Sequence, residues 1–162
     1  MKEATDIVLI NSFSSFIPNN REDRLLKAAL IGMKKALGTP EEKKMMNTFL
    51  RKSCHPHSIN AFPASPLTRG PSPSGRNRLL QDLDLLISTH GLPCGFPLKA
   101  RVLNITGTED SIVSPSANSL LLKDLQKHLH IQPICWTISN EGHSILKPEI
   151  IKRVRNWLEV SN

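Results

Sequence analysis

Two side chains that can share a proton, the carboxylate of Asp110 and the imidazole of His143, each follow a short apolar run. Asp110 lies in the string ITGTEDSIV and follows the apolar run at residues 102–106. His143 lies in the string EGHS and follows the apolar run at residues 134–138. A carboxylate beside a histidine holds the imidazole tautomer and stabilises the imidazolium, so the histidine can take a proton from a nucleophile. The two residues therefore indicate general-base chemistry, with Glu109 as the alternative carboxylate. The plainer interpretation is a turn aspartate and a loop histidine.

A serine nucleophile for this chemistry is carried on a strand-to-helix turn with the pattern G-x-S-x-G. No such string occurs in the 162 residues. The nearest one, GPSPSG at residues 70–75, lacks the second glycine at the right place, and its two prolines do not fit such a turn. Ser74 is better interpreted as the N-cap of the next helix. Ser12, Ser14 and Ser15 follow a predicted strand but have no glycine beside them.

Cysteine and histidine residues raise the alternative of a metal site. Cys54, His55 and His57 lie close together, with His90 and Cys94 further along, but their spacing matches no standard zinc pattern. We therefore predict no metal and no cofactor. The three cysteines are an odd number without a C-x-x-C pair, which indicates free thiols in a reducing compartment.

The bulk composition is that of a globular protein, with 39% hydrophobic and 22% charged residues. No stretch approaches the about 20 apolar residues of a membrane span. The N-terminal residues carry early acids and lack the apolar region of a signal peptide. We expect a soluble, cytoplasmic protein.

The elements that must position Asp110 and His143 alternate between strands and helices. Apolar runs at residues 6–11, 101–106 and 134–138 predict three short strands. A stripe of apolar side chains at three- and four-residue steps, in the first case Leu25, Leu26, Ala29, Met33 and Leu37, predicts each of the helices. The predicted helices cover residues 22–37, the residues that follow a capping box from Thr39 to Glu42, residues 76–90, residues 115–130 and the residues from Pro148 on. The alternation predicts parallel strands with right-handed crossovers in an α/β sheet, whose carboxyl ends gather functional residues.

The segment between the first two predicted strands differs in charge from the rest of the chain. Residues 12–80 hold twelve Lys and Arg and four Asp and Glu, a net charge of +8, whereas the remaining residues have a net charge of −1. Five prolines in residues 53–75 predict a loop there. A basic segment can steer an acidic partner, although solvated helix faces explain any single lysine. The absence of Tyr, helix-turn-helix and zinc spacing disfavours nucleic acid.

The pattern strand, G-x-x-D-x-I-V, helix, strand, x-G-H and helix resembles the last third of α/β-hydrolases. That family runs its triad in the order Ser, acid, His. The resemblance implies that Asp110, directly before x-I-V, is the triad acid in preference to Glu109, and that His143 is the base. It also implies a partial α/β-hydrolase fold of about three parallel strands. Residues 1–11 and 91–162 would belong to the core, and residues 12–90 would form a helical lid.

Within that superfamily, the strings VLINSFSSF, G-M-x-x-A-L and M-M-x-x-F-L are most similar to the esterases that cleave pimeloyl-carrier-protein methyl ester in biotin synthesis. The resemblance implies a carboxylic-ester hydrolase with a small acyl-ester substrate, carried on an acidic acyl carrier protein that the basic lid receives. The lid residues expected to contact this partner are Arg21, Arg24, Lys27, Lys34, Lys35, Arg51 and Lys52.

The resemblance places the nucleophile and the oxyanion-hole donors before the strand that begins at Asp6 and ends at Asn11. We therefore expect the nucleophile-bearing half to be absent from this chain, which alone would be inactive. The exposed edge of that first strand would pair with the missing half or with another chain. The alternative is a non-catalytic binding module that uses the basic lid.

Overall fold

The three predicted strands form one parallel sheet. The structure, a computed structural model, describes residues 4–18, 23–61, 70–145 and 147–160. Strands β1 (Asp6–Ile10), β2 (Arg101–Gly107) and β3 (Ile134–Ile138) pair in the order β1-β2-β3. Ile7 lies opposite Val102, and Leu103 lies opposite Ile134. The α/β fold with parallel strands is therefore confirmed, and all three strands end at the same edge of the sheet.

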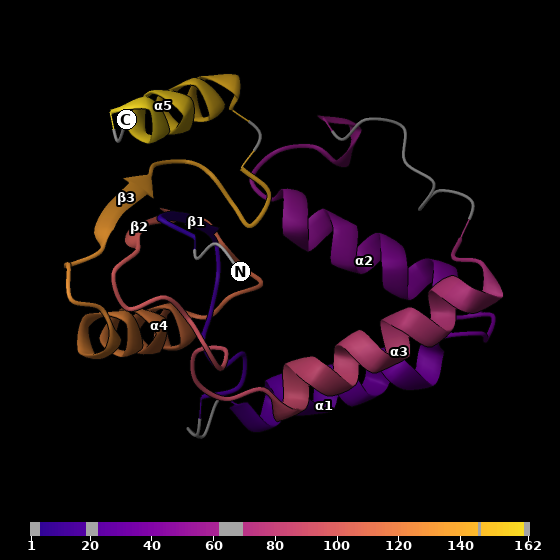
Figure 1. Cartoon of the computed structure of the whole chain (residues 1–162). Coiled ribbons are helices and arrows are strands. Elements are labelled where there is room, and N and C mark those ends of the chain that lie inside the picture. The colour runs from indigo at the N-terminus through magenta and orange to yellow at the C-terminus, as the bar shows by residue number, and fades with distance from the viewer. Residues whose placement is uncertain (1–3, 19–22, 62–69, 146, 161–162) are drawn as a thin grey trace.

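Helices cover both faces of this sheet, because side chains of successive strand residues point to opposite sides. Val102 packs with the buried leucines of α4 (Pro115–His128). Leu103 and Ile105 pack instead with Ile150 of α5 (Pro148–Glu159). Figure 1 shows α4 and α5 on opposite sides of the sheet. Within the described residues, β1 pairs only with β2, so its other edge is open.

The helical segment, defined as residues 12–90, leaves the sheet after β1 and returns before β2. It contains α1 (Asp23–Ala36), α2 (Glu42–Cys54), the short 3-10 helix η1 (Ile59–Ala61) and α3 (Pro73–Ser88). Figure 1 shows α1, α2 and α3 beside the sheet and its two covering helices. Buried apolar side chains join this segment to the start of α4. They are Phe16, Ile17, Leu30, Leu83, Val113 and Ala117.

Two predicted helix starts are wrong in detail. Thr39 is not the N-cap of α2, which begins at Glu42, and the Glu42 carboxylate accepts the main-chain N–H of Gly38 at 2.6 Å. This bond to Gly38, two residues after the end of α1, is made in place of the predicted capping box. Ser74 is not the N-cap of α3 either. Ser72 caps that helix by accepting the N–H of Gly75 at 3.1 Å, with a proline at the first helical position.

The predicted loop at residues 53–75 and the predicted α1 core also need correction. Residues 62–69 of that loop lie outside the described residues. The part before residue 62 includes the end of α2 and η1, and the part after residue 69 includes the start of α3. Pro73 fits at that start because a proline in a first helical turn removes no intrahelical hydrogen bond. Leu25, expected in the buried stripe of α1, has 79% of its surface exposed. None of the described helices is long and apolar enough to cross a membrane.

Candidate functional site

Asp110 is held rigidly just beyond the end of β2. Its Oδ1 accepts the main-chain N–H groups of Ile112 at 2.8 Å and Val113 at 3.0 Å. Its Oδ2 lies 3.0 Å from Nδ1 of His143. Only 9% of the Asp110 side chain is exposed, whereas Glu109 is exposed and donates only its main-chain N–H, to the Glu141 carbonyl. The carboxylate that lies beside His143 is therefore that of Asp110.

His143 lies in the loop after β3 and bonds Asp110 through Nδ1. Because an ionised carboxylate only accepts hydrogen bonds, Nδ1 carries the proton and Nε2 of the neutral ring is left as an acceptor. The side chain of His143 is 29% exposed. The geometry gives a histidine whose tautomer is fixed on one side and whose basic nitrogen is available on the other.

Two glycines allow the loops after β2 and β3 to touch. A Cβ on Gly107 would lie 2.3 Å from the Glu141 carbonyl oxygen, and a Cβ on Gly142 would lie 1.6 Å from the His55 carbonyl oxygen. No side chain fits at either position without a shift of the main chain. The glycines of the G-x-x-D and x-G-H strings are therefore required by packing. Gly107 lets the two loops approach each other closely, and Gly142 lets the loop after β3 approach the residue that follows α2.

Asn11 joins the ends of all three strands, and the sequence did not single it out as a site residue. Its Nδ2 donates to the carbonyl oxygens of Gly142 at 2.9 Å and His143 at 2.7 Å, while its Oδ1 accepts the Gly107 N–H at 2.9 Å. The side chain is buried and its φ is +45°, a conformation that asparagine tolerates better than most residues. An asparagine as the last residue of the predicted strand 6–11 was the one available signal.

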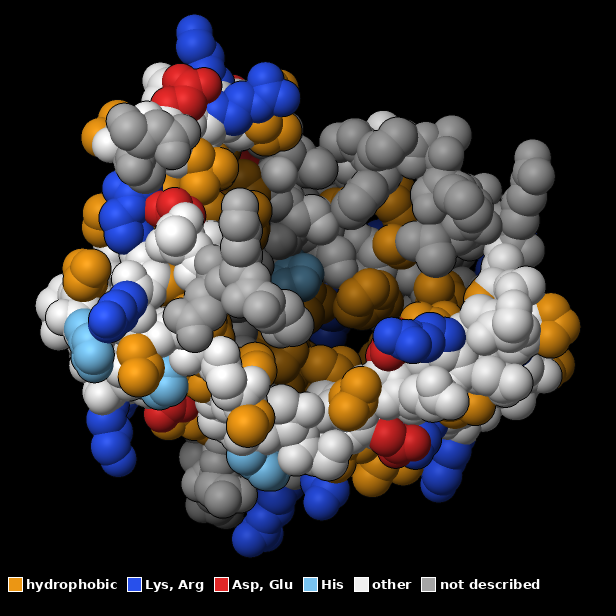
Figure 2. Space-filling view, in the orientation of Figure 1, with side chains coloured by type: hydrophobic (Ala, Val, Ile, Leu, Met, Phe, Trp, Pro, Cys, Tyr) orange, Lys and Arg blue, Asp and Glu red, His pale blue; other side chains and the backbone are white. Residues whose placement is uncertain are grey.

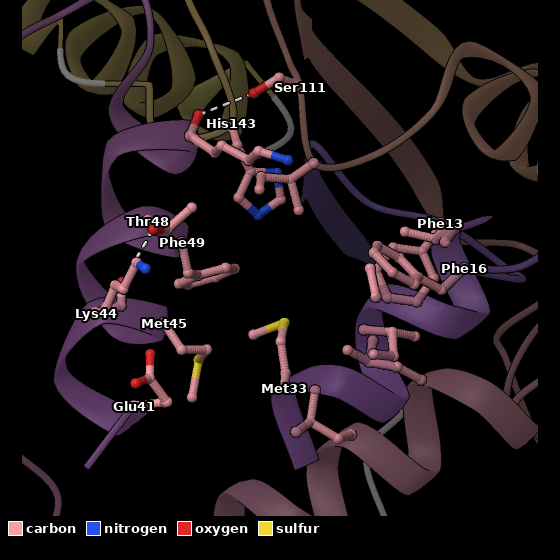
Figure 3. Close-up of a pocket in the computed structure, with 17 residues that line it drawn as sticks. Phe13, Phe16, Met33, Glu41, Lys44, Met45, Thr48, Phe49, Ser111 and His143 are labelled. Carbon is pink, nitrogen blue, oxygen red and sulfur yellow. Dashed lines mark hydrogen bonds between the residues drawn. The ribbon is translucent and has the colours of Figure 1, made fainter. Parts of the chain in front are cut away.

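A cavity of about 530 Å³ opens in front of His143. Figure 2 shows a hollow between the sheet part and the helical segment, lined with hydrophobic side chains. In Figure 3 the His143 ring points into this cavity, with Phe49 and Met45 of α2 on one side and Phe13 and Phe16 on the other. Most of the wall is apolar. The polar lining residues are Glu41, Lys44, Thr48, Lys52, Ser111 and His143.

The serines that follow β1 make hydrogen bonds to groups other than His143. Ser14 donates to Asp124 at 2.5 Å, and Ser15 donates to the Ile17 carbonyl at 3.2 Å. Ser111 Oγ, which also lines the cavity, donates to the Lys52 carbonyl at 3.1 Å. In the described part of the chain, no serine hydroxyl is hydrogen-bonded to the His143 ring.

The basic residues expected to contact an acidic partner are not all available to it. Arg21 is outside the described residues. Lys34 forms an ion pair with Asp84 of α3. Lys52 is exposed and lines the cavity. The other residues expected to contact an acidic partner are exposed on α1 and α2. These are Arg24, Lys27, Lys35 and Arg51.

The cysteine and histidine residues near Cys54 serve packing and pairing. Cys54 is fully buried, and burial raises the pKa of its thiol, which disfavours the thiolate that a metal needs. His57 Nε2 lies 2.9 Å from Oε1 of Glu141. Among the described residues, no group of three or more His, Cys, Asp or Glu could hold a metal ion.

Comparison with known proteins identifies the fold. No family model matches the chain, and no curated protein matches it in sequence. Among solved structures, it is similar to MGS-M2, an α/β hydrolase from a Medee basin deep-sea metagenome library, with 19% identity and a TM-score of 0.62. It is also similar to the esterase RhEst1 from Rhodococcus sp. ECU1013, with 16% identity and a TM-score of 0.52.

The two comparisons cover 93% and 96% of this chain, but only 53% and 56% of the enzymes. The chain therefore spans about half the length of these solved structures. Over that half, it has the α/β-hydrolase fold.

Proposed function

We propose that this chain is the acid- and histidine-bearing portion of a serine-type carboxylic-ester hydrolase. The observation that supports this most is the Asp110–His143 hydrogen bond of 3.0 Å at the wall of an apolar cavity. The two enzymes with a similar fold are an α/β hydrolase and an esterase, which makes ester hydrolysis the chemistry to test first.

In the proposed reaction, Nε2 of His143 takes the proton of a serine hydroxyl while the serine oxygen forms a bond to the ester carbonyl carbon. Asp110 accepts the Nδ1 hydrogen bond and stabilises the imidazolium. The imidazolium then gives its proton to the alkoxide oxygen as the C–O bond breaks, leaving an acyl-enzyme. Water, activated by the same histidine, releases the acid and restores the serine.

The serine would come from residues outside this sequence, because no G-x-S-x-G string is present in it. We propose that the nucleophile-bearing part pairs with the open edge of β1, either as a preceding part of the same polypeptide or as a second chain. Both arrangements would bring a neighbouring parallel strand, with its terminal turn, to the edge where Asn11, Asp110 and His143 lie.

The substrate we propose is a small ester with an apolar acyl group. The cavity of about 530 Å³ has aromatic, leucine and methionine walls from residues 13 to 86, which suit an alkyl chain. Residues 12–90 would act as a lid over that chain. An acidic acyl carrier protein would be received by its exposed cations, chiefly Arg24, Lys27, Lys35 and Arg51.

The experiment begins with the DNA upstream of the Met1 codon. An in-frame G-x-S-x-G in the upstream reading frame would define the protein to express, and that protein should hydrolyse p-nitrophenyl butyrate. Loss of hydrolysis in His143→Ala, with unchanged folding by circular dichroism, supports the proposal. Hydrolysis that persists in His143→Ala contradicts the proposal. It is also contradicted if neither the upstream reading frame nor any chain that co-purifies with this one contains a G-x-S-x-G string.

A second candidate function is a non-catalytic binding module, which the missing nucleophile string and the exposed cations favour. Here an acidic carrier protein would bind the chain without hydrolysis. Retention of the carrier protein should be lost in an Arg24→Glu, Lys27→Glu, Arg51→Glu variant and kept in Asp110→Asn. Retention that is indifferent to these charge reversals would exclude this function.

A further inference from the structure

Glu141 is a buried acid that the proposed reaction does not use. None of its side chain is exposed, although it lies only two residues before His143. A buried carboxylate is costly unless it has partners that compensate for lost hydration. Among the described residues, its Oε1 has Nε2 of His57 at 2.9 Å and Nζ of Lys147 at 3.2 Å as partners.

His57 and Lys147 belong to different parts of the chain. Lys147 ends that loop, and its Nζ also donates to the Ser139 carbonyl at 3.0 Å, so it closes the loop on itself. His57 belongs to the helical segment and follows the end of α2. The Glu141 carboxylate therefore bridges the His143 loop and the helical segment, two parts of the chain that are 84 residues apart.

Three further contacts hold the end of α2 against the same loops. The Ser53 carbonyl accepts the Ser144 N–H at 2.9 Å, which satisfies one of the last carbonyls of the helix. The Lys52 carbonyl accepts the Ser111 hydroxyl at 3.1 Å, one residue after Asp110. The His55 carbonyl packs so closely on Gly142 that no Cβ fits there. Residues 52–57 thus contact both loops that carry the proposed base and acid.

We propose that Glu141 is a positioning residue for His143, acting with His57 as a clamp that ties the His143 loop to the end of α2. Because α2 also lines the cavity with Lys44, Met45, Thr48 and Phe49, the clamp links the wall that faces the acyl group to the placement of the base. This catalytic meaning rests on the function proposed above. The effect of the clamp on the His143–Asp110 hydrogen bond is independent of that function.

The test is NMR spectroscopy on the ¹⁵N-labelled 162-residue chain, with the imidazole Nδ1–H of His143 assigned by its loss in His143→Ala. In His57→Ala and Glu141→Gln, that resonance should weaken through faster exchange with water. The Ser144 amide should exchange about tenfold faster, as expected for loss of a hydrogen bond to a charged group. His57→Gln, whose amide can donate to the carboxylate, should restore both signals in part.

The matched control is Asp84→Asn, which removes the ion pair with Lys34 between α1 and α3 and should leave both signals unchanged. A lower melting temperature with an unchanged His143 Nδ1–H resonance in the clamp variants would reduce Glu141 to a structural role and overturn the proposal. If Glu141→Gln does not fold, His57→Ala decides, since the His57 side chain is 35% exposed and tolerates truncation. These readouts need no ester hydrolysis, so a failed esterase assay overturns only the proposed function.

Discussion

Asp110 and His143 meet through a single hydrogen bond, 3.0 Å from Oδ2 to Nδ1, across the loops that follow β2 and β3. The remaining oxygen of Asp110 is occupied by the N–H groups of Ile112 and Val113. The carboxylate can therefore neither rotate away nor turn to a different partner without losing those bonds. This arrangement makes the histidine ring the adjustable member of the pair.

Replacing Asp110 with asparagine should remove the acceptor that holds the His143 tautomer. In the nucleophile-bearing form of the protein, Asp110→Asn should lower kcat for a p-nitrophenyl ester by about 10³- to 10⁴-fold. Glu109→Gln should change kcat by less than about twofold, because that exposed side chain makes no bond to His143. Steady-state kinetics measure both, and an equal loss in the two variants would contradict the assignment of the acid.

Asn11 should contribute more to stability than an asparagine on the surface. Asn11→Ala removes two donated bonds and one accepted bond inside the protein and should lower the free energy of unfolding by about 2–4 kcal/mol. Asn11→Asp should cost a similar amount, because a carboxylate cannot donate to the carbonyls of Gly142 and His143. Urea unfolding gives these values. Asn47→Ala, at an exposed position on α2, is the control and should shift the value by less than about 0.5 kcal/mol.

Gly142 and Gly32 should respond to alanine in opposite directions. A Cβ at Gly142 would lie 1.6 Å from the His55 carbonyl oxygen, so Gly142→Ala should destabilise the protein and separate the His143 loop from the end of α2. Gly32 lies inside α1 with no atom within 4 Å of an added Cβ, so Gly32→Ala should stabilise the protein by about 0.5–1 kcal/mol. Thermal unfolding measures both changes. An unchanged melting temperature in Gly142→Ala would contradict the close approach of Gly142 to the His55 carbonyl.

The contact between α2 and α3 should weaken in acid. The Arg76 guanidinium, followed by the Gly38 N–H, lowers the pKa of the Glu42 carboxyl below its usual value. The folded protein therefore binds fewer protons at this group than the unfolded chain does, so the stabilisation is complete above the usual pKa and is lost as pH falls through the lowered one. Glu42→Gln should flatten the dependence of stability on pH below about pH 4, relative to wild type.

The control for that titration is Glu41→Gln. Glu41 is exposed, and its replacement should leave the acid limb of the stability curve as it is in wild type. Urea midpoints between about pH 2 and pH 7 compare the three proteins. An acid limb that is the same in Glu42→Gln and wild type would assign the pH dependence to other carboxyls.

Sequence patterns predicted the sheet and the proximity of Asp110 and His143, because both residues follow strands whose carboxyl ends share one edge. They could not predict Asn11, since its partners are main-chain atoms 96 and 132 residues away. The bond between His57 and Glu141 was missed for the same reason. Contacts of this kind depend on tertiary packing, and no local periodicity reports it.

Local rules failed where two acceptable choices lay side by side. Ser72 and Ser74 are both good N-caps, and only the position of Pro73 in the first turn decides in favour of Ser72. Glu42 was expected to cap its own helix but bonds Gly38 and Arg76 instead. The guanidinium of Arg76, brought close by the packing of α3, provides a stronger partner than a main-chain N–H of the same turn.

Fluorophosphonate labelling tests most directly the claim that this chain supplies the acid and the base of a serine hydrolase but not its nucleophile. The account predicts no labelled serine in the 162-residue chain alone. It predicts a single labelled serine, within G-x-S-x-G, in the form that contains the nucleophile-bearing part, and labelling at least about 10³-fold slower in His143→Ala. Stoichiometric labelling of any serine within these 162 residues, or equal rates with and without the His143 imidazole, would contradict the account.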